Sequence, residues 1–205
     1  MTINLLNKND DKPDLHSSID SDTKPTQSIS LFPDISSVDS NNGFKSEPLR
    51  PQFWSQFALN ELNHSEWEAL CDGCGSCCLI KYIDEDEDGN VDEELVEYTD
   101  VTCQLMDCAT GYCSHYATRQ EYVPDCIQLT MDNLPNMMWL PSHCAYKRLY
   151  KGQSLPSWHL LLTQDPVVTQ HEMRAANVGV AGRCVSETSM SEEEMEIRVV
   201  SWVNP

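Results

Sequence analysis

Four cysteines stand within eight residues of the chain and form a CxxCxxCC pattern: Cys71, Cys74, Cys77 and Cys78. In a CxxC turn both thiolates reach one metal ion, at about 2.3 Å from each sulfur, and neighbouring backbone N–H groups point at the sulfurs. Gly73 and Gly75 fit such a loop, because a tight turn around an ion often needs a positive φ. The pattern therefore predicts the core of a metal–thiolate site.

The adjacent pair Cys77-Cys78 is unusual, because neighbouring side chains rarely bind one ion together. The pair therefore indicates two sites or one multi-iron cluster. Four downstream cysteines would complete two four-sulfur sites: Cys103, Cys113, Cys126 and Cys144. The alternative is that some of these four are buried thiols, which pack like small hydrophobic residues. We expect that second role for Cys108 and Cys184, which have no partner at ligand spacing.

Charge adds a requirement to the proposed site. Two divalent ions held by eight thiolates keep a net charge of about −4. The chain already has 13 basic residues against 33 acidic ones, a net charge of −20. We expect that some of the basic residues near the proposed ligands offset thiolate charge, although they could equally be surface charges. The candidates are Lys81, Arg119, Lys147 and Arg148.

Other chemistry is less well supported. Histidines could serve as ligands or as a general base, and His115 and His143 stand nearest to cysteines. Asp84–Val91 copies the start of an EF-hand loop, but Leu95 occupies the position of the bidentate Glu, which favours a solvated acidic turn. A Walker loop, a dinucleotide fingerprint and a G-x-S-x-G motif are missing from the sequence, which leaves an enzymatic activity open.

The composition indicates where the protein works. The excess of acidic residues repels nucleic-acid phosphates and anionic membranes, so direct binding to either is not expected. Mean hydropathy is −0.45, and the sequence has no apolar run of about 20 residues that could span a bilayer. The first residues do not resemble a secretory signal. We expect a cytoplasmic protein that binds a metal ion, and the sequence indicates no protein partner. Disulfides rarely persist in the cytoplasm, which favours metal ligation for its 10 cysteines.

The chain divides at residue 51. Residues 1–50 are rich in Ser, Asp, Asn, Thr and Pro and predict a disordered tail. Residues 51–205 form the predicted cysteine-rich metal-binding domain. Its expected fold is α+β, a small irregular domain of short helices and a β-hairpin organised by the metal.

Local signals place these elements. Apolar spacing predicts a helix over 53–62, and a Ser65–Glu68 capping box predicts a second one that runs into Cys71. Two strands, 79–83 and 95–102, are expected to flank a turn at 88–90. Ser142 and Asp165 are the predicted N-caps of helices over 143–150 and 166–174, and a terminal strand is expected over 197–203.

The run from Glu66 to Leu79, EWEALCDGCGSCCL, resembles the YcgN family of bacterial proteins, part of the wider CxxCxxCC group of zinc- or iron-chelating proteins. Further matching segments are Phe53-Trp54, Asp84–Asp86, Cys103, Cys113–Tyr116, Pro124–Thr130, Asn133–Pro135, Trp139–Pro141, Cys144–Tyr146 and Leu155–His159. The resemblance covers roughly residues 51–205. It implies zinc or iron as the metal and the eight cysteines named above as the shared set. The chain departs from the family pattern at Gly111, where a cysteine is expected.

The resemblance implies a site and leaves the reaction open. The leading interpretation is a zinc- or iron-binding protein whose site is structural or serves metal handling. An iron–sulfur cluster protein, with an enzyme among the possibilities, is the alternative. A redox sensor is another, because thiols of an uncoordinated CxxC have depressed pKa values.

Overall fold

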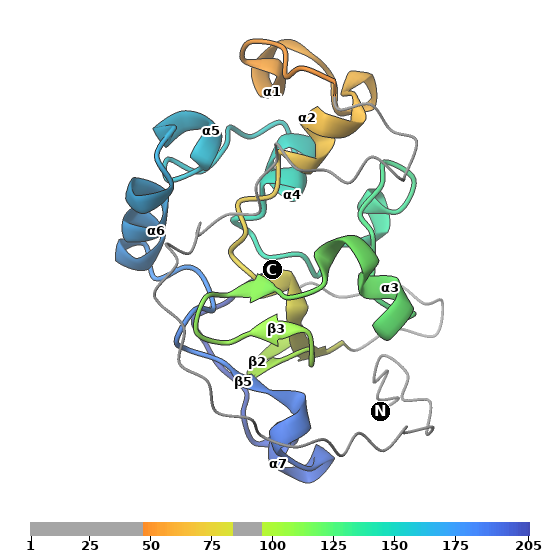
Figure 1. The fold of residues 1–205 in the computed structure, drawn as a ribbon, viewed down its shortest axis with the longest axis vertical. Helices are drawn as coiled ribbons and strands as arrows, with labels where there is room; N and C mark the ends of the chain where they lie inside the picture. Colours follow the sequence, from red (N-terminus) through yellow and green to blue (C-terminus); the bar gives the residue numbers. More distant parts are fainter. Residues whose placement is uncertain (1–46, 84–95) are drawn as a thin grey trace, which may run out of the picture.

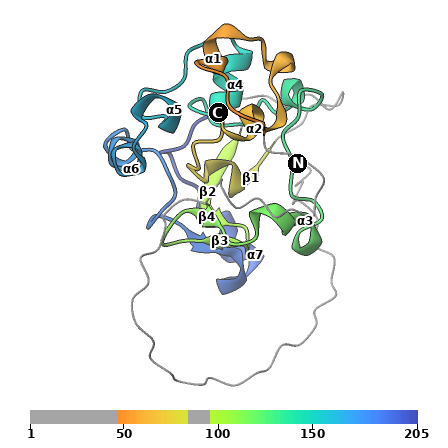
Figure 2. The ribbon, with the colours of Figure 1, turned by 45° about the horizontal axis from the view of Figure 1, so that its top comes forward.

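The computed structural model describes residues 47–83 and 96–205. The predicted tail, up to residue 46, and the acidic turn at 88–90 lie outside these residues, as does the EF-hand-like stretch. Figures 1 and 2 show helices α1, α2 and α4 grouped at one end of the molecule, with the small sheets and α7 toward the other. The α+β class and the short helices predicted from the sequence are confirmed.

The described helices are all short. The α-helices are α1 Phe53–Gln56, α2 His64–Glu68, α3 Arg119–Tyr122, α4 Ala145–Tyr150, α5 Leu160–Thr163, α6 Pro166–Ala175 and α7 Glu192–Glu196. The 3-10 helices are η1 Leu59–Glu61, η2 Ser76–Cys78, η4 Tyr116–Thr118, η5 Leu134–Asn136 and η6 Glu187–Ser189. Among the residues described, no helix has the length and apolar character needed to cross a membrane.

The described strands form two small sheets. Strands β1 (Leu79–Tyr82) and β2 (Glu97–Thr102) pair antiparallel, as the sequence predicts, with an irregular register between Leu79 and Lys81. Strand β5 (Val185–Ser186) adds to β2 in parallel, so that the order is β1-β2-β5. Strands β3 (Met106–Asp107) and β4 (Tyr112–Cys113) form a separate hairpin.

The N-cap of α2 differs from the prediction. The cap is Asn63, whose side chain accepts from the Glu66 amide at 2.9 Å, while Glu66 accepts from the Asn63 amide at 3.1 Å. Ser65 lies inside the helix. The Asn63–Glu66 capping box forms in place of the Ser65–Glu68 box because Arg50 makes an ion pair of 2.6 Å with Glu66. This ion pair fixes the Glu66 carboxylate over the first turn of the helix. The helix also ends at Glu68, before Cys71.

The single helix predicted over 53–62 is wrong, because Phe57 and Ala58 are extended and divide the segment into α1 (Phe53–Gln56) and the 3-10 helix η1 (Leu59–Glu61). Helices α4 and α6 form where they are predicted, with one correction to a cap. Asp165 caps α6 as predicted, and its carboxylate accepts from the amides of Val167 and Val168. Helix α4 is capped at Cys144 rather than Ser142, and Gly152 follows it with a positive φ of 70°. The predicted terminal strand is wrong, because Val199 makes only an isolated bridge with Thr99.

A compact core holds the helical end against the sheets. Leu70, Leu79 and Val180 are almost fully buried, and Tyr98 hydrogen-bonds the carbonyl of Trp139 across this core. Tyr146 on α4 donates to the Trp67 carbonyl of α2 at 2.9 Å. These contacts fix the segments on either side of the CxxCxxCC loop.

Candidate metal centre

The CxxCxxCC loop begins after buried Leu70, which lies just beyond the end of α2, and it is held in place by Asp72. One carboxylate oxygen of Asp72 accepts from the Cys74 amide at 3.1 Å, and the other accepts from Trp158 Nε1 at 3.3 Å. Gly73 and Gly75 have φ of 70° and 73°, the positive values that the sequence predicts. The loop therefore turns back on itself and then enters η2 and β1.

Gly75 is needed for space as well as for its φ. A Cβ built there would stand 2.5 Å from Val180 Cγ2 and 3.0 Å from the Gly111 carbonyl. The Val180 amide in turn donates to the Cys74 carbonyl at 3.0 Å. The C-terminal segment around Val180 is therefore packed directly against the cysteine loop, a contact that the sequence did not indicate.

The first group of thiols consists of Cys71, Cys74, Cys77 and Cys144. Desolvation is the main cause that raises the pKa of Cys71, and the negative charges of Cys77, Asp72 and Cys144 add to it. Desolvation likewise raises the pKa of Cys74, with charge contributions from Cys77 and Cys71. Cys144, at the start of α4, has its pKa raised to about 12 by desolvation and by Cys77. These four thiols are electrostatic neighbours although Cys144 is remote in sequence.

The second group consists of Cys78, Cys103, Cys113 and Cys126. Desolvation raises the pKa of Cys103, and the charges of Cys126 and Cys113 raise it further. Cys126 is in turn affected by Cys113, and Cys78 by Cys126. The Cys103 amide donates to the Cys78 carbonyl at 3.2 Å, which ties this group to the CxxCxxCC loop.

The two groups meet at the adjacent pair. The sulfurs of Cys77 and Cys78 lie 3.9 Å apart. A hydrogen bond from Cys78, together with the Lys81 charge, lowers the pKa of Cys77 to about 7. Cys77 is the electrostatic neighbour of members of both groups, which makes it the junction between them.

The cysteine side chains lie in two groups, but they do not yet surround a common metal position. Within the described residues, no three Cys, His, Asp or Glu side chains are already arranged to hold a metal ion. Two buried polar atoms, Ser76 Oγ and His143 Nε2, have no hydrogen-bond partner in that part of the chain. Ser76 precedes Cys77, and His143 precedes Cys144. A donor set of eight soft thiols with two unsatisfied polar atoms beside it fits zinc or iron.

The four predicted basic neighbours fall into two classes. Lys81 is buried, donates to the Cys77 carbonyl at 3.2 Å and has thiolates of the adjacent pair as its charged neighbours. Desolvation raises the pKa of Cys126, and the charge and hydrogen bond of Arg119 oppose that rise. Lys147 instead donates to the carbonyls of Met138 and Leu140, and Arg148 to that of Ser154.

The two remaining cysteines, Cys108 and Cys184, lie next to each other. Cys184 is buried, and desolvation followed by a hydrogen bond with Cys108 raises its pKa to about 12. The Thr102 hydroxyl contacts the Cys108 sulfur at 3.7 Å. The prediction of a packing role is consistent with this placement, but their pairing was not visible in the sequence because 76 residues separate them.

The histidines divide in the same way. His159 is fully buried, pairs with the Leu70 carbonyl at 3.0 Å and accepts from the Leu161 amide, which is a structural role. His115 contacts the Ser114 hydroxyl and the ring of Tyr122. His143 packs near Trp158, and desolvation lowers its pKa. Of these, only His143 adjoins the first thiol group with a buried free nitrogen.

Comparison with known proteins identifies the family of this chain. A family model described as "CxxCxxCC: Putative zinc- or iron-chelating domain" matches residues 70–145. A UPF0260 protein of Parvibaculum lavamentivorans is 44% identical over 150 residues, which cover 73% of this chain and 92% of that protein. This chain belongs to the UPF0260 family.

Other UPF0260 proteins extend the match. One from Shewanella amazonensis is 44% identical over 151 residues, with 74% of this chain and 95% of that protein covered. One from Rhizobium etli is 41% identical over 150 residues, with 73% and 89% covered. No solved structure matches the chain. The resemblance to the CxxCxxCC group inferred from the motifs is thus confirmed.

Proposed function

We propose that this UPF0260 protein is a cytoplasmic metal-binding protein that holds zinc or iron through eight cysteines. One group of ligands is Cys71, Cys74, Cys77 and Cys144, and the other is Cys78, Cys103, Cys113 and Cys126. The observation that carries the proposal is the gathering of thiols from distant segments into two groups that meet at the 3.9 Å Cys77–Cys78 contact.

The residues around the cysteines favour metal binding over eight free thiols. Thiolates are suitable ligands for zinc and for iron–sulfur clusters, and each proposed group has the four sulfurs that structural zinc prefers. Lys81 and Arg119 stand beside the thiols in an otherwise acidic chain, where they offset part of the remaining negative charge. The positive φ of Gly73 and Gly75 lets the loop turn tightly around an ion.

A second candidate is an iron–sulfur cluster protein. The junction of the two groups at Cys77 and Cys78 favours it, because neighbouring thiolates of one loop can ligate different irons of a cluster. Such a cluster would serve electron transfer, sensing or catalysis. Anaerobic isolation separates the two candidates, because a cluster is brown and absorbs near 400 nm whereas zinc is colourless.

Elemental analysis of natively purified protein tests the proposal. We expect about two zinc ions per chain, or iron with inorganic sulfide, since eight ligands complete two four-sulfur sites. Cys144→Ser removes a ligand from the first group and Cys126→Ser removes one from the second, so each variant should lose metal. Cys184→Ser is the matched control and should keep the full content.

Circular dichroism verifies that the variants remain folded. Native protein without bound zinc or iron would contradict the proposal. Full metal content in both ligand variants would contradict the assignment of the two groups. Loss of metal in Cys184→Ser alone would move the site to the Cys108–Cys184 pair.

A further inference from the structure

Beside the thiols lies a cavity of about 340 Å³ with two arginines in its wall. Three segments build it: the cysteine loop at Asp72–Cys74, the turn and strand at Thr110–Tyr112, and α6 with the loop that follows it to Arg183. Its volume is within the range of small-molecule sites. The last of these segments lies outside residues 70–145, which the family model matches.

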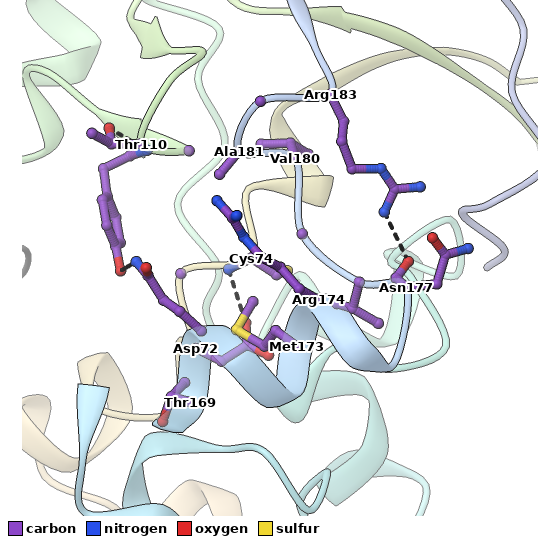
Figure 3. A pocket seen from close by; sticks show the side chains of 17 residues that line it. Asp72, Cys74, Thr110, Thr169, Met173, Arg174, Asn177, Val180, Ala181 and Arg183 are labelled. Atoms are coloured by element: carbon purple, nitrogen blue, oxygen red, sulfur yellow. Dashed lines mark hydrogen bonds between the residues drawn. The ribbon is translucent and has the colours of Figure 1, made fainter. Parts of the chain in front are cut away.

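Arg174 points into this cavity. Figure 3 shows its side chain leaving α6 and reaching across the space toward Ala181 and Thr110. Within the part of the chain that the structure describes, its guanidinium has neither an ion pair nor a hydrogen bond. By contrast, Arg50 and Arg198 form ion pairs with Glu66 and Asp100 at 2.6 and 2.7 Å.

Arg183 lies in the loop that follows α6 and is held in place. Its guanidinium stacks over the Trp202 ring at 3.8 Å and donates to the Asn177 carbonyl at 3.1 Å. Desolvation lowers its pKa, and no carboxylate is among the causes of the shift. The described partners of Arg183 are thus a carbonyl and an aromatic ring, which leave its positive charge in the cavity wall without a neutralising carboxylate.

The single acidic residue of the cavity wall, Asp72, does not neutralise the two arginines. Asp72 already accepts hydrogen bonds from the Cys74 amide and from Trp158 Nε1. The neutral polar groups of the wall include Gln170, whose Nε2 donates to Tyr112 Oη at 3.4 Å. The cavity therefore presents two guanidinium groups and one engaged carboxylate in a chain whose net charge is −20.

We propose that this cavity binds the oxyanion of a small metabolite, a carboxylate or a phosphate, with Arg174 as its main contact. The planar guanidinium matches the paired oxygens of either group and donates two hydrogen bonds at once. Arg183 is the second, fixed cation, and Cys74 places the ligand beside the cysteine loop. The proposal stands without the metal, because none of these contacts requires an ion.

Calorimetric titration of the purified full chain tests the site. The probes are inorganic phosphate and succinate, each compared with sodium chloride at equal ionic strength. We expect saturable binding of at least one oxyanion, and the one preferred identifies the ligand class. Arg174→Gln should weaken binding at least tenfold, because it removes a charge-assisted bidentate contact. Arg174→Lys should recover part of the loss.

Lys151→Gln is the control, since it removes one positive charge from the end of α4, away from the cavity wall. Its affinity should match that of the wild type. The proposal is overturned if neither probe binds beyond the chloride effect, or if Arg174→Gln and Lys151→Gln bind equally. Arg174 is exposed on α6, so its replacement leaves the core intact.

Discussion

At the residue scale, Gly75 shows how closely the cysteine loop is packed. Its φ of 73° is unfavourable for other residues, and a Cβ there would collide with Val180 at 2.5 Å. Gly152 has nearly the same φ, 70°, but a Cβ would meet nothing within 4 Å. Substitution of Gly152 therefore tests the cost of the backbone conformation alone, whereas substitution of Gly75 adds the cost of steric crowding.

We predict that Gly75→Ala destabilises the protein more than Gly152→Ala does. Both substitutions impose a left-handed conformation that costs about 1–2 kcal/mol. Gly75→Ala adds overpacking against Val180, worth about 1–3 kcal/mol. Urea unfolding of both variants measures the difference, and equal free energies of unfolding would show that the Val180 contact yields without cost.

The thiols illustrate a second lesson at this scale. The pKa of Cys77 is lowered to about 7 and that of Cys144 is raised to about 12, although both residues belong to the same proposed group. The cause is local: Cys77 receives a hydrogen bond and faces Lys81, whereas Cys144 is desolvated near another thiol. Spacing in the sequence identifies candidate ligands, but it does not show these environments.

At the element scale, α2 depends on an ion pair across 16 residues. Glu66 is fully buried and accepts from Arg50 through its amide, Nε and Nη2, at 2.9, 2.8 and 2.6 Å. These hydrogen bonds lower the pKa of Glu66 to about 2. The pair fixes the start of the helix that leads into the CxxCxxCC loop.

We predict that this pair makes stability fall in acid. Because the folded pKa of Glu66 is below its ordinary value of 4.5, its contribution is complete above about pH 4.5 and is lost as the pH falls toward 2. Glu66→Gln should lower the free energy of unfolding by about 2 kcal/mol at neutral pH. Thermal unfolding from pH 3 to 7 measures both effects.

Exposed Glu121 provides the control for that series. Glu121→Gln should keep the wild-type stability and the wild-type acid dependence. If Glu66→Gln keeps the same acid dependence as the wild type, the loss of stability in acid comes from other carboxyl groups.

Helix α6 offers a separate test, because it carries Arg174 into the cavity. Asp165 accepts from Val167 and Val168 at 2.8 and 3.2 Å and satisfies two amides of the first turn. Asp165→Ala should cost about 1 kcal/mol, the usual value of an N-cap. Chemical denaturation measures it, with Asp132→Ala as an exposed control outside any helix. An unchanged midpoint for Asp165→Ala would show that α6 is held by its tertiary contacts alone.

The helices and strands also show which parts of the fold are predictable from the sequence. Local signals found the β1–β2 pair and the cap of α6, because a turn signal between two strand-forming segments and an Asp-Pro helix start are properties of neighbouring residues. The α2 cap was misplaced because Arg50 decides between two overlapping boxes. The terminal strand failed because apolar residues near Val199 pack against β2 through one bridge only. The eight ligand candidates were proposed from spacing, but their two groups needed the fold.

At the scale of the whole molecule, residues 47–83 and 96–205 contain little regular structure for their number. Its longest described helix, α6, has 10 residues, and the β3–β4 hairpin pairs two residues from each strand. The segments that carry Cys103, Cys113 and Cys126 are joined mainly by turns and short 3-10 helices. Short elements of this kind gain little stability from their own hydrogen bonds. We therefore expect that packing and the metal proposed at the thiols hold these segments together.

Removal of the metal should therefore affect the whole domain. A structural zinc site contributes about 10–16 kcal/mol of apparent binding free energy to folding, and an entire domain is stable by only about 5–15 kcal/mol. We predict that treatment with a strong chelator unfolds or aggregates residues 51–205, and that added zinc or iron reverses the change before aggregation. Circular dichroism and thermal melting of chelated, untreated and reconstituted protein provide the measurement. A metal-free protein with an unchanged melting profile would show that the thiol groups are not needed for folding, and would assign the site to metal handling alone.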